Sequence, residues 1–118
     1  MMLIVGGIAS GRRTFARGLG YGPLDCVLGA ERMLGGAGPG SDLEALADDM
    51  ATRPVVIMAE VGLGVVPLDP HERAWREQAG RLACLLAARA DCVVRMVAGI
   101  PQVLRGRPLR KDGSPWRP

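Results

Sequence analysis

The chain opens with a short apolar run, MMLIV, that passes directly into a glycine-rich segment, GGIASGRRTF, at residues 6–15. The apolar run is typical of a buried β-strand, and the glycines after it are typical of the sharp turn that leads from a strand into a helix. Residues 12–19 then predict a short helix, which Gly20 and Gly22 bring to an end. The beginning of the sequence therefore predicts a strand, a loop and a helix in succession.

The alternation of strand and helix continues along the chain. The run VVIMA at residues 55–59 is continuously apolar, as in strands of parallel sheets that are covered on both faces. Such alternation predicts an α/β protein with a mostly parallel sheet. Residues 25–34 favour either a strand end or a helical turn. The other expected elements are a helix opened by a capping box of Ser41 and Glu44, a long helix from Asp69-Pro70 to Ala90, a strand at 93–98 and a short last strand around 103–104.

Size and charge limit the organisation of the chain. With 118 residues, 48% of them hydrophobic, the sequence predicts one domain over residues 1–104. Residues 95–118 hold six basic groups and one acidic group, so residues 105–118 are expected to form a flexible basic tail. Only 3% of the residues are aromatic, and none alternates with the arginines as a base-stacking surface requires. Nucleic acid is therefore not an expected partner.

The cysteines and the apolar stretches indicate where the protein works. Cys26, Cys84 and Cys92 are odd in number and lack the spacing of a disulfide framework or a zinc site, which favours a reducing cytoplasm. The longest apolar stretch, residues 55–66, is interrupted by Glu60 and is too short to cross a membrane. MMLIV lacks the features of a signal peptide. A cytoplasmic protein without a membrane span is the expectation.

The glycine segment has the outline of a phosphate-binding loop, GxxxxGK[ST]. Gly6 and Gly11 have the required spacing, but Arg12 and Arg13 occupy the positions of the lysine and the hydroxyl residue. Thr14 comes one residue late, which turns it by about 100° on a helix. Backbone amides and arginines can still attract phosphate, whereas phosphoryl transfer is impaired. The alternative is a glycine-rich turn with no phosphate role. The candidate residues for binding phosphate or nucleotide are Gly6, Gly7, Ser10, Gly11, Arg12, Arg13 and Thr14.

Glu60 closes the predicted strand at residues 55–59. Because α/β proteins bind ligands at the carboxyl ends of their strands, Glu60 is a candidate catalytic carboxylate. The alternative for Glu60 is an acid that faces solvent.

The segment EVGLGVVP at residues 60–67 is followed by DPHERAWREQAGRLACLLAARADCVV and then AGIP. Together with the GG-x-x-SG start, these motifs resemble the bifunctional adenosylcobinamide kinase / adenosylcobinamide-phosphate guanylyltransferase family of cobalamin biosynthesis. The resemblance implies a small P-loop-type three-layer fold, GTP or ATP with Mg²⁺, a cobinamide-type substrate and a homotrimer. Asp25-Cys26 looks like an Asp-Cys pair of that family, which makes Asp25 a candidate metal ligand.

The chain also departs from this family. Family members are longer, and the portion without a counterpart here, between the first helix and Asp25, carries the histidine that accepts GMP. The single histidine, His71, begins a helix elsewhere and is expected to be an exposed residue of its first turn. We therefore expect a nucleotide-binding protein of cobalamin biosynthesis that has lost guanylyl transfer, with kinase activity left open. The alternative is a non-catalytic relative that binds phosphate or a partner protein.

Overall fold

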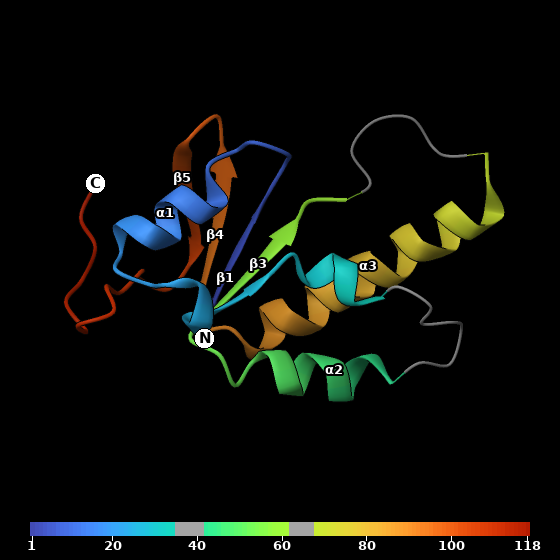
Figure 1. The fold of residues 1–118 in the computed structure, drawn as a ribbon, viewed down its shortest axis with the longest axis horizontal. Helices are drawn as coiled ribbons and strands as arrows, with labels where there is room; N and C mark the ends of the chain where they lie inside the picture. Colours follow the sequence, from blue (N-terminus) through green and yellow to red (C-terminus); the bar gives the residue numbers. More distant parts are fainter. Residues whose placement is uncertain (35–41, 62–67) are drawn as a thin grey trace.

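A central sheet organises the computed structural model, which describes residues 1–34, 42–61 and 68–118 (Figure 1). Within these residues the sheet has five strands in the order β2-β3-β1-β4-β5. β1, β2, β3 and β4 run parallel, and β5 is antiparallel to β4. The strands are β1 (Met2–Gly6), β2 (Cys26–Leu28), β3 (Val55–Ala59), β4 (Cys92–Val97) and β5 (Ile100–Arg105). The predicted α/β class with a mostly parallel sheet is confirmed.

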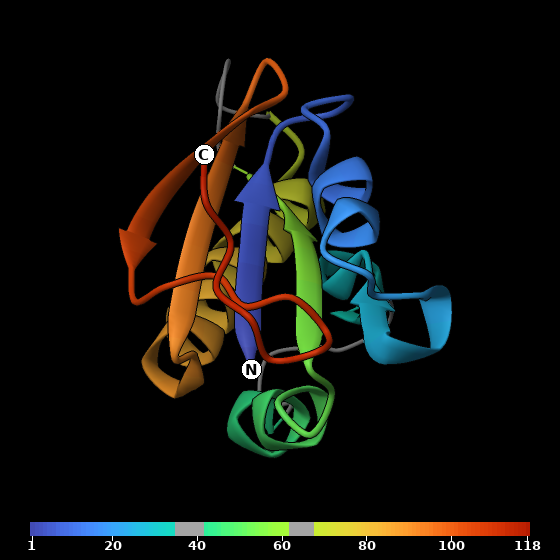
Figure 2. The ribbon, with the colours of Figure 1, turned by 90° about the vertical axis from the view of Figure 1, so that its left-hand side faces the viewer.

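Helices cover both faces of the sheet and produce three layers. One face packs against α1 (Arg12–Gly18) and the C-terminal segment, which Figure 2 shows crossing this face beside α1. The other face packs against α2 (Leu43–Met50), α3 (Pro70–Arg89) and the 3-10 helix η2 (Ala30–Leu34). A second short 3-10 helix, η1 (Pro23–Asp25), leads into β2.

The core lies on both sides of the sheet, which explains why the strands are apolar at successive positions. Val56 and Met58 of β3 face α2 and α3, while Val55 and Ile57 face α1. All four side chains are buried. Burial of one such side chain contributes about 1.5–3 kcal/mol. No helix in the described parts of the chain is long and apolar enough to span a membrane.

α2 and α3 both begin with a capping aspartate. Asp69 caps α3 by accepting a 2.9 Å hydrogen bond from the His71 amide, and Pro70 begins the helix as predicted. The predicted cap of α2 was wrong. Asp42 is the N-cap, and its Oδ1 accepts from the Ala45 amide at 3.0 Å, whereas Ser41 lies outside the described residues. Aspartate caps as well as serine does, and a start one residue later places Leu43 in the core.

The last strand is longer than predicted. β5 has six residues and forms a hairpin with β4 through the two-residue turn Ala98-Gly99. Both turn residues have positive φ, 50° and 78°, as a tight hairpin turn requires. Pro101 lies within β5, although proline has no amide to donate. It is tolerated because β5 is the edge of the sheet.

Residues 105–118, predicted as a basic tail, contact the domain at several points. The Lys111 amide donates to the Leu19 carbonyl at 2.8 Å, and the Lys111 ammonium lies 3.0 Å from Oδ2 of Asp25. The ring of Trp116 meets that of Phe15 edge to face, with centroids 5.4 Å apart. These contacts hold the segment against α1.

Candidate functional site

Three parallel strands end together at one edge of the sheet. Gly6 of β1 lies in register with Ala59 of β3 and with Met96 of β4. The glycine loop, Glu60 and the β4–β5 turn follow these residues directly. In parallel α/β proteins this edge is where ligands bind. The structure therefore brings the predicted loop and the predicted catalytic carboxylate to the same edge.

The loop between β1 and α1 presents backbone amides. Ala9 and Gly11 adopt the left-handed conformation, with φ of 57° and 93°. The Ser10 amide donates to the Gly7 carbonyl at 3.3 Å. Among the described residues, the amides of residues 7–9 and 11–14 have no hydrogen-bond acceptor. Successive amides in such a turn, at the start of a helix, form a concave site for an anion.

Two glycines of the loop are required by close packing. A Cβ atom on Gly6 would collide with the hydroxyl of Ser10 and come within 2.8 Å of the Met96 carbonyl oxygen. A Cβ on Gly11 would lie 3.3 Å from the Cα atom of Gly99, at a φ that other residues rarely adopt. The Gly99 amide also donates to the Ser10 carbonyl at 2.9 Å. The loop is thus fixed against the β4–β5 turn.

Ser10 lies beneath the loop. It is 7% exposed, and its hydroxyl has no hydrogen-bond partner within the described residues. Its position against Gly6 indicates that it supports the loop from below.

The first turn of α1 carries Arg12, Arg13 and Thr14. Arg12 is half-buried, whereas Arg13 and Thr14 are exposed. Burial lowers the pKa of Arg12 from its ordinary value, and the Glu31 carboxylate opposes this effect. An arginine nevertheless stays charged in a protein. Two positive side chains therefore stand beside the free amides of the loop.

Glu31 is a residue that the sequence did not single out. It lies in η2, just after β2 ends, and is 7% exposed. Its Oε1 accepts a 2.7 Å hydrogen bond from the Ala59 amide at the end of β3. A buried carboxylate near Arg12 thus belongs to the same edge of the sheet. Glu31 follows the apolar run at residues 26–28 by three positions, and that run is too short to identify a strand, so no signal in the sequence marked this acid.

Glu60 forms an ion pair at this edge. Its Oε2 lies 3.1 Å from Nε of Arg95 on β4, and its amide donates to the Gly6 carbonyl at 2.8 Å. The side chains of Glu60 and Arg95 are 27% and 39% exposed, so a ligand can reach both. The rest of the segment EVGLGVVP after Val61, residues 62–67, lies outside the described residues.

Asp25 is not brought to the glycine loop. Asp25 precedes β2. The first residue of β2, Cys26, is in register with Val55 at the start of β3, so Asp25 lies at the amino ends of these strands, opposite to the glycine loop. Its Oδ2 accepts from the Gly22 amide at 2.8 Å and pairs with Lys111 at 3.0 Å. Among the described residues no group of three His, Cys, Asp or Glu side chains could hold a metal ion.

His71 is exposed in the first turn of α3, as expected. Figure 1 shows that this end of α3 points away from α1 and the glycine loop. The structure therefore does not bring the histidine to the candidate site.

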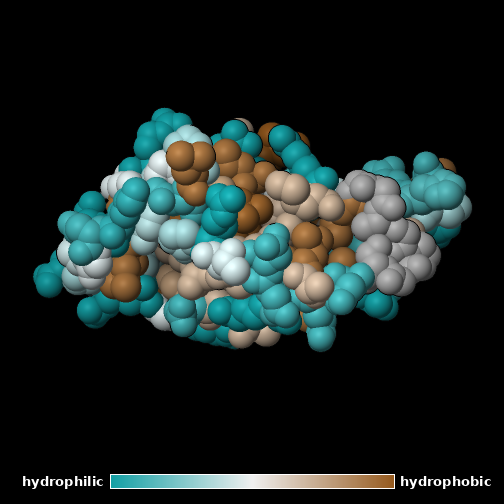
Figure 3. Space-filling view, turned by 60° about the horizontal axis from the view of Figure 1, so that its bottom comes forward, coloured by the Kyte–Doolittle hydropathy of each residue, from teal (hydrophilic) through white to brown (hydrophobic). Residues whose placement is uncertain are grey.

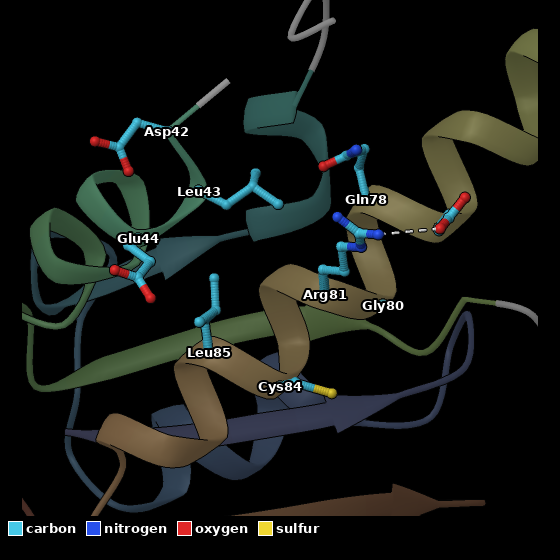
Figure 4. A pocket seen from close by; sticks show the side chains of 9 residues that line it. Asp42, Leu43, Glu44, Gln78, Gly80, Arg81, Cys84 and Leu85 are labelled. Atoms are coloured by element: carbon cyan, nitrogen blue, oxygen red, sulfur yellow. Dashed lines mark hydrogen bonds and ion pairs between the residues drawn. The ribbon is translucent and has the colours of Figure 1, made fainter. Parts of the chain in front are cut away.

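A separate groove of about 920 Å³ lies between α2 and α3 (Figure 4). Leu43 and Leu85 point into it, and Arg81 on its wall pairs with Glu77 at 3.3 Å. On the face turned toward the viewer in Figure 3, apolar surface is exposed between polar side chains. The groove does not include the glycine loop.

A glycine loop between a central parallel strand and a helix, in three layers, defines a small α/β protein of the P-loop type. The chain belongs to the cobinamide kinase / cobinamide phosphate guanyltransferase family, because the model of that family matches residues 39–104, more than half of the sequence. The match includes Glu60, α3 and β4, and it begins after the glycine loop.

A similar protein is the bifunctional adenosylcobalamin biosynthesis protein of Pseudomonas aeruginosa. The two are 40% identical over 67 residues, which are 57% of this chain and 38% of the relative. The chain thus spans about two fifths of the length of the curated relative that it matches.

Proposed function

We propose that this protein binds the phosphates of GTP or ATP on its glycine loop and acts in cobalamin biosynthesis. The observation that carries the proposal is the set of loop amides that have no acceptor among the described residues, with Arg12 and Arg13 beside them. Such amides and guanidinium groups are complementary to phosphate oxygens. Family membership and the similarity to an adenosylcobalamin biosynthesis protein support the metabolic assignment.

Binding and transfer place different demands on the loop. A phosphate loop uses a lysine as a compact charge inside the cradle, whereas the planar fork of Arg12 is larger and binds oxygens in pairs. Arg13 stands where a hydroxyl would contact the metal. We infer that nucleotide binding persists and that phosphoryl transfer, if it occurs, is slow.

Guanylyl transfer through a histidine is not part of the proposed function. A covalent GMP intermediate needs a nucleophile within reach of the nucleotide's phosphorus. The single histidine of the sequence is exposed at the start of α3. We therefore expect no GMP attached to the protein.

A cobinamide-type acceptor would approach the same edge of the sheet. The Glu60 carboxylate is accessible there, and its ion pair with Arg95 fixes its orientation. A carboxylate in this place can accept the proton of an attacking hydroxyl. Glu60 is thus the proposed catalytic residue for any remaining kinase activity.

A thermal melt with GTP and with ATP, each with and without Mg²⁺, tests the proposal. A ligand at ~100 times its dissociation constant stabilises the folded protein by about 2.7 kcal/mol, which raises Tm by several degrees. The double variant Arg12→Ala, Arg13→Ala should lose this shift, whereas Arg73→Ala on the exposed side of α3 should keep it. A melt that no nucleotide alters would refute nucleotide binding.

The alternative function is that of a non-catalytic relative that binds phosphate or a partner, and the groove between α2 and α3 is the surface that favours a partner. Half-buried Leu85 and the edge of the buried Leu43 line the groove between charged side chains. We propose that this face packs against further copies of the chain in a homo-oligomer, a trimer by resemblance to the family. Light scattering after size-exclusion chromatography checks the mass, and Leu85→Asp should reduce it to that of one chain.

A further inference from the structure

A pocket of about 350 Å³ adjoins the glycine loop on the α1 side of the sheet. Its volume is at the lower end of the range for small-molecule sites, about 300–1,000 Å³. Gly11 and Thr14 line the end of the pocket nearest the loop. Phe15, Met96, Arg110 and Trp116 form other parts of its wall. A molecule bound here can therefore continue onto the free amides of the loop.

The C-terminal segment builds one side of this pocket. It is anchored by the Lys111 amide, which donates to the Leu19 carbonyl at 2.8 Å, and by the Tyr21 hydroxyl, which donates to the Leu109 carbonyl at 2.9 Å. The Trp116 amide donates to the Pro108 carbonyl at 2.9 Å and closes the segment on itself. Figure 2 shows this segment beside α1. Trp116 is thereby held at the pocket.

The aromatic residues of the pocket are arranged at right angles. The planes of Phe15 and Trp116 meet at 80°, so the two rings cannot stack face to face on one another. Both side chains are only half-buried. Aromatic rings in the wall of a pocket can stack on a flat heterocycle, and such stacking does not depend on which base is bound. Arg110 adds a positive group, and its Nη1 also donates to the Gly18 carbonyl at 3.3 Å.

We propose that this pocket holds the purine base of the nucleotide whose phosphates lie on the glycine loop. The inference rests on the proposed nucleotide binding. Trp116 and Phe15 contact the base, and Gly11 and Thr14 lie where the base site meets the phosphate site. Trp116 and Arg110 lie beyond the residues matched by the family model, which end at 104. The proposed base site therefore depends on residues of the C-terminal segment outside that match.

Calorimetric titration of the full chain with GTP, ATP and inorganic tripolyphosphate tests the proposal. The nucleotides should bind more tightly than tripolyphosphate, which contacts only the loop. Trp116→Leu should weaken nucleotide binding about fivefold or more, since stacking on one aromatic contributes about 1 kcal/mol at least. The same variant should leave the tripolyphosphate affinity unchanged within twofold. Trp75 packs against the core on the face of the sheet that α3 covers, away from the pocket. Trp75→Phe should therefore change neither affinity.

Tryptophan fluorescence gives a second measurement that does not need a variant at Trp116. In Trp75→Phe the only remaining tryptophan is Trp116. GTP should quench or shift its emission, and tripolyphosphate should not. If tripolyphosphate binds as tightly as the nucleotides, or if GTP leaves the emission unchanged, the base site is refuted and phosphate binding stands. If neither nucleotide nor tripolyphosphate binds, the proposed function fails and the base site fails with it.

Discussion

The Oε1 atom of Glu31 lies 2.7 Å from the backbone nitrogen of Ala59 and accepts its hydrogen bond. This contact joins the segment after β2 to the last residue of β3, at the edge where the glycine loop also lies. The acid is buried, and the electrostatic influence of its charge reaches Arg12. One side chain therefore holds the end of β3 and also favours the charged form of Arg12.

Removal of this carboxylate should destabilise the protein. In Glu31→Ala the partly buried amide of Ala59 loses its acceptor. Because a fully buried unsatisfied donor costs about 1–3 kcal/mol, we expect a loss at the lower end of this range. Glu31→Gln keeps an acceptor oxygen and should lose less. Urea unfolding measures the free energies, with Glu44→Ala on the exposed side of α2 as the control, expected within about 0.5 kcal/mol of the wild type. Equal stability of Glu31→Ala and Glu44→Ala would contradict the role of this hydrogen bond.

Restoration of the usual loop residues should strengthen nucleotide binding. In the double variant Arg12→Lys, Arg13→Ser, the ammonium group fits the cradle of amides more closely than a guanidinium does. We expect about a tenfold lower Kd for GTP, the size of one charge-assisted hydrogen bond of about 1.5 kcal/mol. Calorimetric titration checks this, with Arg73→Lys as the matched change outside the loop. An unaltered Kd would show that the nucleotide binds elsewhere.

The sequence predicted the parts of the fold that depend on neighbouring residues. The apolar run at 55–59 identified β3 because both of its faces are buried, and Asp69-Pro70 identified the start of α3 because capping is a local interaction. The glycine loop was recognisable because the spacing of Gly6 and Gly11 after an apolar run is a local pattern. The sequence could place these features without knowledge of the tertiary structure.

The remaining features depend on contacts between distant residues. Glu31 bonds an amide 28 positions away, so nothing near it in the sequence marks it as buried. Asp25 was proposed as a metal ligand because Asp25-Cys26 resembles a pair of the family. β2 has only three residues between two short 3-10 helices, and so short a run does not show in the sequence that Asp25 precedes the strand. The contact of Trp116 with Phe15 joins the two ends of the chain. These contacts become visible only in the folded structure.

The three cysteines should differ sharply in reactivity. Burial raises the pKa of the Cys26 thiol and, likewise, that of Cys92, so both are less ionised than ordinary thiols at neutral pH, whereas Cys84 is exposed on α3. Because the thiolate is the reactive form, iodoacetamide should modify Cys84 first in the folded protein. Mass spectrometry of peptides should find Cys26 and Cys92 modified only after urea unfolding. Rapid labelling of the folded Cys84→Ser variant would contradict the burial of the other two.

The pairing of Asp25 with Lys111 should make stability depend on pH in the acidic range. The Gly22 amide, and then Lys111, favour the ionised carboxylate and hold the pKa of Asp25 below its ordinary value. A depressed pKa in the folded state stabilises the protein above the unfolded value of about 3.9, and this contribution is lost as the pH falls through the lower folded pKa. The urea midpoints of the wild type and of Asp25→Asn should therefore differ at pH 7 and converge below pH ~4. Asp49→Asn, on the exposed side of α2, serves as the control. Its effect on the urea midpoint should be the same with and without the Lys111 side chain. Since Lys111 anchors the C-terminal segment, Lys111→Met should reproduce part of the loss of stability at pH 7. A pH-independent difference between Asp25→Asn and the wild type would show that the ion pair does not stabilise the fold.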